Sequence, residues 1–364
     1  MSILDNAYLV PLFSDQGVDC YKLENENYIN EYYVTSEAET RKLLNKPEVI
    51  SYDVYRSMLN ATGQMMYYFK QQKKVTSANI LCILRGALNF PLEESCYKEH
   101  IRVHDISFLS SERVIREAEV VGLEVKYEKL ALVPDSTLLI GDIIATGDTL
   151  VLCMQYVMDF YKKHGNKLRN IIIFTIGGAK AISHLEKLTQ EIREVWPDFE
   201  GFITVFYEGV FGLYEHKGVS KINWPNIDFY WEKGIIAPEF RQQTLSMQDP
   251  LFEKCIIYDG GARRYEIQNH VEEVLDFWEY MAAHGDEISM QELLVEKLGH
   301  PLDISYDEWV KINHYERIEE STKSWLYRQE QGFISGVKNQ SIKEIAERRV
   351  REFKTAMQKY IIEN

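Results

Sequence analysis

The stretch that decides the fold is Leu138-Leu139-Ile140-Gly141-Asp142-Ile143-Ile144-Ala145-Thr146-Gly147-Asp148-Thr149-Leu150. The apolar run from Thr137 to Ile140 predicts a strand that is buried on both faces. The run leads to an acid, Asp142, and then to a loop of small residues, after which an amphipathic helix is predicted to begin. A strand, a small-residue loop and a helix in this order indicate an open α/β sheet.

The loop has the properties of a phosphate site. Unpaired backbone N–H groups point outward where a parallel strand gives way to a helix, and the helix dipole favours an anion there. Thr146 and Thr149 add hydroxyl donors, and Asp142 offers a carboxylate for a sugar hydroxyl or a metal-bound water. The same residues also suit an ordinary strand–turn–helix crossover, so this loop alone leaves both interpretations open.

A second loop precedes it in the chain. The apolar run from Asn79 to Leu84 predicts a strand that ends at Arg85-Gly86-Ala87. In a doubly wound sheet this loop lies at the carboxyl end of its strand, as the first one does, with a cation and a glycine at its tip. A surface arginine in a plain turn is the competing interpretation.

Taken together, the two loops resemble those of the type I phosphoribosyltransferases, which bind 5-phosphoribosyl-1-diphosphate (PRPP). The resemblance covers about residues 79–208, and neither loop fits a dinucleotide G-x-G-x-x-G or a G-x-x-x-x-G-K-[ST] pattern. It implies that Arg85, Gly86 and Ala87 cradle pyrophosphate and that Asp142 contacts the ribose and, through water or PRPP, Mg²⁺. Asp142 and Arg85 are the implied catalytic residues. The implied 5-phosphate loop consists of Ala145, Thr146, Gly147, Asp148 and Thr149.

The sequence departs from the family pattern in four places. The family usually has two successive acids where this chain has Gly141-Asp142, and a second glycine where it has Ala87. Asp148 lies inside the phosphate loop and cannot contact a phosphate as an anion. Ala145 stands where some purine-using members carry an acid, which weakens the case for a hypoxanthine or guanine enzyme.

The activity that the resemblance implies is displacement of pyrophosphate from Mg²⁺-bound PRPP by a planar nitrogenous acceptor. The protein would position the nucleophile and stabilise the leaving group. The family's flexible catalytic loop corresponds to the segment between residues 109 and 129, where the choice of cation stays open among Arg113, Arg116, Lys126 and Lys129. Aromatic residues that suit either acceptor stacking or core packing are Tyr207, Phe211, Tyr214, Trp224, Phe229, Tyr230 and Trp231.

Composition excludes several other classes of protein. The chain has 364 residues with 45% hydrophobic and 27% charged residues, and a formal net charge of −15 argues against general nucleic-acid binding. Five cysteines without C-x-x-C spacing predict reduced thiols and a cytoplasmic location. The N-terminus lacks signal-peptide character, and no apolar run reaches membrane-spanning length, so we expect no membrane association.

The chain as a whole predicts an α/β fold with a doubly wound, mostly parallel sheet and a mainly helical C-terminal domain. We expect the boundary at residues 240 and 241, which gives a domain over 1–240 and a helical one over 241–364. Residues 1–34 are interpreted as an irregular arm with one strand. Helices are expected over residues 36–44, 52–72, 88–97 and 148–163. A homodimer is expected by analogy only.

Three functions fit the sequence. The first is a phosphoribosyltransferase that uses PRPP, Mg²⁺ and a nitrogenous acceptor. The second is a non-catalytic sensor of PRPP or a nucleotide, which the departures at Ala87 and Gly141 motivate. The third is an effector that modifies an existing nucleotide. The sequence does not name the acceptor or assign a role to the C-terminal helices.

Overall fold

The fold is built on one mixed sheet. The computed structural model describes residues 3–116, 119–131, 133, 136–213, 229–253 and 260–361. Within these residues ten strands form a sheet in the order β1-β2-β3-β9-β8-β7-β4-β5-β6, with β10 paired to β9. The central strands from β3 to β5 run parallel, and the outer pairings are antiparallel. The strands are β1 (Tyr8–Asp15), β2 (Val18–Glu24), β3 (Glu31–Glu37), β4 (Ser77–Leu84), β5 (Arg102–Arg116), β6 (Glu119–Lys129), β7 (Thr137–Ile144), β8 (Asn170–Gly178), β9 (Gly201–Leu213) and β10 (Phe229–Ile236).

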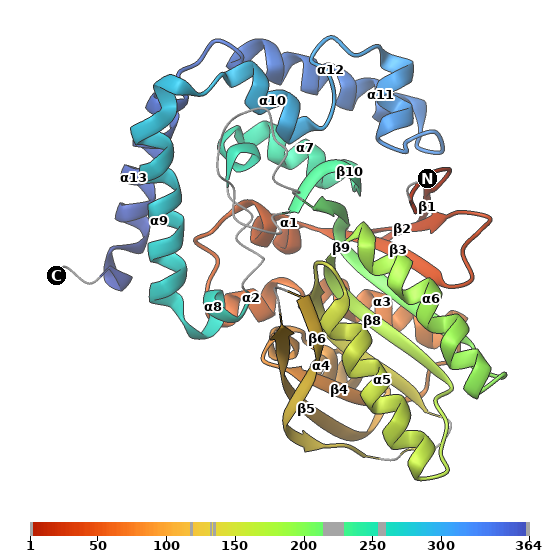
Figure 1. The fold of residues 1–364 in the computed structure, drawn as a ribbon. Helices are drawn as coiled ribbons and strands as arrows, with labels where there is room; N and C mark the ends of the chain where they lie inside the picture. The colour runs from red at the N-terminus through yellow and green to blue at the C-terminus, as the bar shows by residue number, and fades with distance from the viewer. Residues whose placement is uncertain are drawn as a thin grey trace.

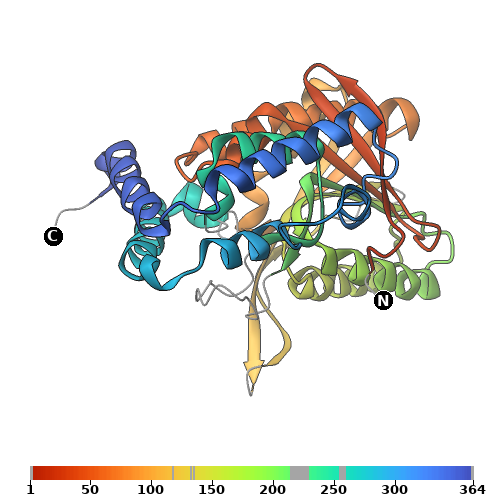
Figure 2. The ribbon, with the colours of Figure 1, turned by 90° about the horizontal axis from the view of Figure 1, so that it is seen from above.

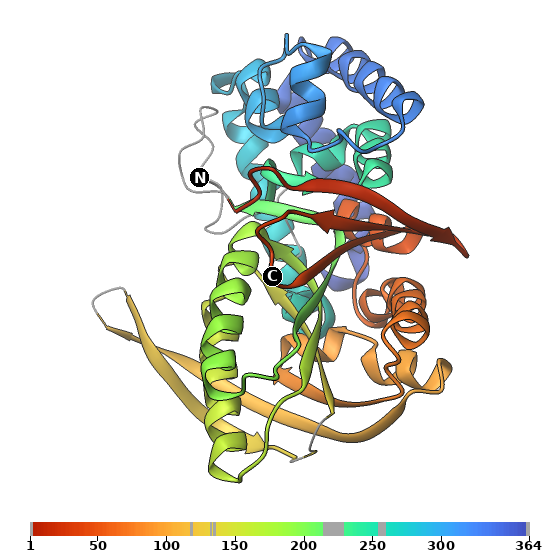
Figure 3. The same ribbon diagram turned by 90° about the vertical axis from the view of Figure 1, so that its right-hand side faces the viewer.

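Helices cover both faces of this sheet (Figure 1). Helices α5 (Asp148–Lys163) and α6 (Ala179–Val195) lie on one face. Helices α3 (Leu59–Gln72) and α4 (Leu92–Lys98) lie on the other, and Figure 3 shows the two layers on either side of the strands. Every residue of β8 is buried, as are the first five residues of β7, which is what a parallel sheet covered on both faces requires. The expectation of an α/β fold with a large, mostly parallel sheet is therefore confirmed.

The N-terminal segment is more ordered than its sequence indicates. Instead of an irregular arm with one strand, three strands extend the sheet, and β3 pairs in parallel with β9. Tyr32, Tyr33 and Val34 of β3 are buried. The tyrosine and polar residues of this segment interrupt the apolar alternation that indicates a strand, so the local sequence predicts the strands only weakly. Burial against β9 and α3 stabilises them in the folded protein.

Three predicted helices differ in detail. Helix α1 (Ala38–Asn45) begins with a capping box between Glu37 and Thr40 instead of at Ser36, whose hydroxyl donates to Glu208. The helix expected over 52–72 is divided into α2 (Tyr52–Ser57) and α3. The helix expected over 88–97 is replaced by a 3₁₀ turn, η1 (Gly86–Asn89), and by α4, because Pro91 cannot donate a helical hydrogen bond.

Strands β5 and β6 form a long antiparallel hairpin that projects from the body of the molecule (Figure 2). It occupies the segment in which the resemblance implies a flexible catalytic loop. Lys126 lies within 3.3 Å of Glu112 and 2.7 Å of Glu124, so its charge is neutralised along the hairpin. Lys129 is exposed, whereas the side chains of Arg113 and Arg116 lie outside the described residues.

The C-terminal part is helical from α7 (Pro238–Met247) onward in the described residues. Helices α9 (Ile267–His284) and α13 (Ile342–Met357) pack side by side, away from the sheet (Figure 1). The remaining elements are η2 (Asp249–Phe252), α8 (Gly260–Tyr265), η3 (Gly285–Glu287), α10 (Met290–Leu298), α11 (Tyr306–Ile312), α12 (Glu320–Val337) and η4 (Gln358–Tyr360). One continuous hydrophobic core joins these helices to the sheet, and the division at residues 240 and 241 stays a prediction.

Two further sequence expectations concern the whole chain. Cys20, Cys82, Cys96 and Cys153 are buried and form no disulfide bond, while Cys255 lies outside the described residues. Among the helices that the structure describes, none combines the length and the apolar character needed to cross a membrane.

Candidate functional site

The two loops singled out in the sequence lie next to each other. Strands β4 and β7 are parallel neighbours, with Leu81 opposite Ile140, so the loops that follow them leave the same edge of the sheet. A Cβ added to Gly86 would lie 2.3 Å from Oδ1 of Asp142. Only glycine therefore leaves room for the Asp142 carboxylate at this point. The structure brings Gly86 and the Asp142 carboxylate into direct contact.

The second loop leads into the N-terminus of α5. Gly147 has a φ of +89°, in the left-handed region that favours glycine, and it turns the chain from β7 into the helix. Ala145, Thr146, Asp148 and Thr149 are half-buried. The first hydrogen bond of the helix joins Val151 N to Gly147 O at 3.0 Å. The backbone amides of residues 148–150 therefore come before the first hydrogen bond between residues four apart. This geometry suits an anion.

Strand β8 supports the loop from the side. A Cβ on Gly178 would lie 3.2 Å from the carbonyl oxygen of Ala145, and one on Gly177 would lie 3.0 Å from that of Ile144. Two glycines at the end of a strand thus let the loop backbone approach closely. These two glycines were not predicted as part of the site, although paired glycines at a strand end indicate such an approach.

The Asp148 side chain lies toward α6. Its Oδ1 is 3.7 Å from Nε2 of His184, and a Cβ on Gly147 would lie 3.0 Å from Cδ2 of the same imidazole. His184 therefore flanks the loop and partly balances the Asp148 charge whenever the imidazole is protonated. No local sequence pattern points to His184, because its proximity to the loop depends on how α6 packs beside α5.

Arg85 is engaged by the C-terminal helices. Its Nη1 lies 2.9 Å from Oε1 of Glu266, and the two side chains are 54% and 38% exposed. The hydrogen bond from Arg85 holds the pKa of the Glu266 carboxyl below its usual range. The cation that is predicted to meet pyrophosphate thus has a carboxylate beside it in this structure. Glu266 lies 181 residues away in the chain and was not foreseen.

The first departure from the family pattern has a structural counterpart. A Cβ on Gly141 would lie 2.4 Å from Cβ of Phe90, so the aromatic side chain occupies the space that a side chain at position 141 would need.

The departure at Ala87 fits the backbone of the first loop. Ala87 is buried within η1, and its backbone has no positive φ. The Leu84–Arg85 peptide bond that precedes this turn is cis.

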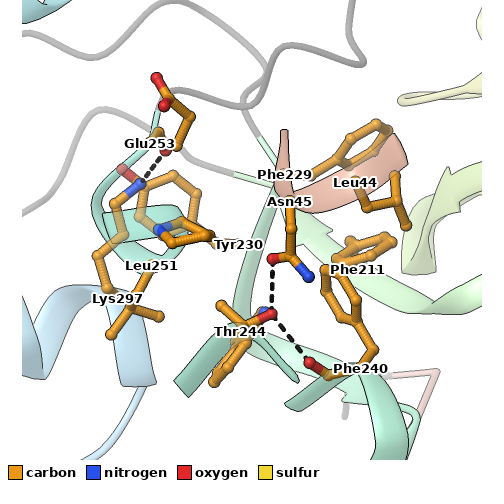
Figure 4. Close-up of a pocket in the computed structure, with 12 residues that line it drawn as sticks. Leu44, Asn45, Phe211, Phe229, Tyr230, Phe240, Thr244, Leu251, Glu253 and Lys297 are labelled. Atoms are coloured by element: carbon orange, nitrogen blue, oxygen red, sulfur yellow. Dashed lines mark hydrogen bonds between the residues drawn. The ribbon is translucent and has the colours of Figure 1, made fainter. Parts of the chain in front are cut away.

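The aromatic residues considered for acceptor stacking are mostly core residues. Tyr207 is fully buried and its hydroxyl lies 2.6 Å from Oγ1 of Thr62. Phe211, Phe229, Tyr230 and Trp231 are also buried, whereas Tyr214 and Trp224 lie outside the described residues. The alternative of core packing therefore holds for Tyr207, and the other four line a small pocket together with residues of α1, α7 and α10 (Figure 4).

A magnesium site is implied only through the resemblance. Among the described residues no group of three or more histidine, cysteine or acidic side chains is placed to hold a metal ion. Mg²⁺ commonly binds through one or two carboxylates, several waters and the phosphates of its substrate. The half-buried Asp142, whose Oδ1 accepts from Ile143 N at 2.9 Å, fits that limited role.

Comparison with known proteins gives a distant likeness. No protein-family model matches the sequence, and no curated protein matches it. The AQ2163 protein from Aquifex aeolicus is 14% identical, with a TM-score of 0.35 over 50% of this chain and 90% of that one. A hypoxanthine phosphoribosyltransferase from Staphylococcus aureus is 16% identical, with a TM-score of 0.27 over 36% of this chain and 66% of its own. A purine phosphoribosyltransferase from Pyrococcus horikoshii is 17% identical, with a TM-score of 0.26 over 41% and 81%.

Proposed function

We propose that the protein binds PRPP with Mg²⁺ and transfers its phosphoribosyl group to a planar nitrogenous acceptor, with release of pyrophosphate. The observation that carries this proposal is the contact between the two loops, in which Gly86 lies against the Asp142 carboxylate at one edge of the sheet. In this proposal the Arg85 cation and the N-terminus of α5 would bind opposite ends of one phosphorylated sugar.

Each residue has a role in the proposal. The amides and hydroxyls of Ala145, Thr146, Gly147 and Thr149 would hold the 5-phosphate, while the Asp148 side chain stays with His184. Asp142 would hold the ribose and the metal-bound water. Arg85, with Gly86 and Ala87, would bind the pyrophosphate and stabilise the charge that develops as it leaves. Mg²⁺ would supply further charge neutralisation on the phosphates.

A second candidate is a non-catalytic sensor that binds PRPP or a nucleotide in the same place. It is favoured by Phe90, which fills the space where the family carries its first acid, and by Glu266, which pairs with Arg85. With fewer groups to hold the ribose, and with the charge of Arg85 neutralised by Glu266, the protein would stabilise the transition state less. Binding of the ligand would be weakened to a smaller extent.

Two measurements separate these functions. Isothermal titration calorimetry with PRPP and Mg²⁺ tests binding, and pyrophosphate release with a panel of free bases and small amines tests turnover. Asp142→Asn is expected to lower both by at least tenfold. Asp159→Asn is the matched control, because Asp159 lies exposed on α5, and it should behave as the unchanged protein.

The outcomes are distinct. Binding with turnover supports the transferase. Binding without turnover across the panel supports the sensor, and absence of binding contradicts both.

We also propose a cytoplasmic location and no general nucleic-acid or membrane partner. We propose further that the protein is a homodimer, and sedimentation equilibrium would measure its mass.

A further inference from the structure

Strand β8 carries one polar side chain inside an otherwise apolar run. Thr175 follows four apolar residues, 171–174, and precedes Ile176, and it is fully buried. Its hydroxyl oxygen has no hydrogen-bond partner among the described residues. Burial of a hydroxyl in this state costs free energy, because the water that it loses is not replaced. A buried hydroxyl that the fold leaves unpaired needs an explanation, and a role at a binding site is one of them.

Thr175 lies directly beside Asp142. The two residues are paired across the parallel strands β8 and β7, in a register that is unbroken from Thr137 to Ile144. Paired residues of parallel strands have their side chains on the same face of the sheet, and the two strands are about 4.8 Å apart. The Thr175 hydroxyl and the Asp142 carboxylate can therefore meet after a rotation about χ1 of the threonine.

The other side of Thr175 is apolar. On β9 the paired residue is Phe206, and its Cε1 lies 3.3 Å from the place that a Cβ on Gly177 would take. Oγ1 of Thr175 lies 3.1 Å from the same place, so the hydroxyl points toward the carboxyl end of β8, where the two loops leave the sheet. Across the sheet, Asp142 is thus the neighbour that can accept a hydrogen bond from Thr175.

Asp142 will need a further donor once a ligand covers it. Its Oδ1 accepts from Ile143 N at 2.9 Å, and the half-buried carboxylate is still in part open to water. The Cys153 thiol of α5 is no substitute, because burial and the nearby Asp142 charge together raise its pKa to about 11. A ligand that removes the water from Asp142 leaves a buried charge, which is costly unless another group donates to it.

We infer that Thr175 is a positioning residue for Asp142, whose carboxylate accepts a hydrogen bond from the Thr175 hydroxyl when PRPP and Mg²⁺ displace its water. The bond holds the carboxylate in one orientation toward the ribose hydroxyls and removes the cost of two unpaired buried groups. It also gives Asp142 a polar neighbour in a chain whose position 141 is glycine. The inference rests on the proposed function, because that function assigns PRPP and Mg²⁺ to Asp142.

Calorimetric titration of the full-length protein with PRPP and Mg²⁺ tests the inference. Thr175→Val removes the hydroxyl and nearly keeps the shape of the side chain. It is expected to weaken binding at least about tenfold, which corresponds to the loss of one hydrogen bond to a charged group. Thr175→Ser keeps the hydroxyl and should bind within about twofold of the unchanged protein.

The control is Thr204→Val. Thr204 on β9 is also fully buried with an unpaired hydroxyl, but its paired residues are Ile173 and Tyr32. Both valine variants remove a buried hydroxyl that has no partner, so neither should lower the free energy of unfolding in urea. Only Thr175→Val should weaken the binding of PRPP. If this variant does not fold, Thr175→Ala, which also lacks the hydroxyl, takes its place in the titration.

The outcomes separate the inference from the proposed function. Weaker binding in Thr175→Val, with normal binding in Thr175→Ser and Thr204→Val, supports the inference. PRPP binding that Thr175→Val leaves unchanged, or that Thr175→Ser or Thr204→Val weakens to the same extent, overturns the inference and leaves the proposed function standing. Absence of PRPP binding by the unchanged protein contradicts the proposed function and the inference together.

Discussion

The Phe90 side chain occupies the space beside Gly141, where a Cβ would lie 2.4 Å from Cβ of Phe90. Phe90 is itself part of the core, with its ring centre 6.2 Å from that of Tyr207. An acid at position 141 and a phenylalanine at position 90 therefore exclude each other. The absence of a side chain at position 141 is therefore tied to the packing of Phe90 against β7 and does not depend on one residue alone.

We predict that Gly141→Asp destabilises the protein by about 1–3 kcal/mol, because the new side chain overpacks against Phe90. Chemical unfolding in urea measures the change. In the double variant Gly141→Asp with Phe90→Ala, the loss of stability should be smaller than the sum of the two single losses. The new side chain at position 141 then fills the space that the shortened side chain at position 90 leaves. Gly332→Asp is the control, because a Cβ on Gly332 meets nothing within 4 Å. Equal stability of Gly141→Asp and the unchanged protein would show that Phe90 does not fill this space.

The ion pair between Glu266 and Arg85 leads to a second prediction. Glu266→Gln should raise the affinity for PRPP with Mg²⁺ about two- to fivefold, because the pyrophosphate no longer competes with a carboxylate for the guanidinium. The effect is small because both side chains are partly exposed, and such pairs are weak. Calorimetry measures the affinity, with Glu272→Gln in α9, the helix that begins just after Glu266, as the control. Unchanged or lower affinity would contradict competition at Arg85.

The buried carboxyl of Glu208 predicts a dependence of stability on pH. Burial raises the pKa of Glu208 to about 8, although Ser36, Thr40 and the amide of Glu37 all donate to it. Between its unfolded value near 4.5 and about 8, the folded protein holds a proton that the unfolded chain releases. The free energy of unfolding should therefore fall as pH rises through this window, by at most about 1.4 kcal/mol per pH unit from this group.

Urea unfolding from pH 5 to pH 9 measures that slope in the unchanged protein and in Glu208→Gln. The variant cannot titrate at this position, so its stability should fall less steeply. Identical slopes in the two proteins would show that Glu208 is ionised in the folded state across the whole range.

A buried ion pair joins helix α7 to helix α12. Arg241 and Glu330 are 1% and 0% exposed and lie 2.6 Å apart, and Glu330 also accepts from Trp309 at 2.7 Å. Glu330→Gln should destabilise the protein by about 3–5 kcal/mol, because it leaves the Arg241 charge buried without its counterion. Glu279→Gln, which breaks an exposed pair with Lys354, should change stability by at most about 1 kcal/mol. Comparable effects in the two variants would contradict this account.

Local patterns in the sequence were sufficient for the central part of the fold. The apolar run that ends at Leu84 predicted β4, and the small-residue loop with the helical stripe after Asp148 predicted α5, both close to their observed bounds. The apolar run from Thr137 to Ile140 predicted only the first part of β7, which continues to Ile144. Such patterns succeed because hydrophobic periodicity and helix-start signals act over a few residues. The order of the two loops also indicated that they belong at one edge of the sheet.

The tertiary structure alone decided what surrounds these loops. Phe90 beside Gly141, Glu266 beside Arg85 and His184 beside Asp148 are contacts between elements that local patterns do not relate. The three N-terminal strands likewise exist because β9 and the helices bury them. The sequence by itself predicted which residues would bind phosphate, and that assignment stays a prediction. Long-range packing decided which charges and rings lie beside those residues, because packing depends on the positions of all elements at once.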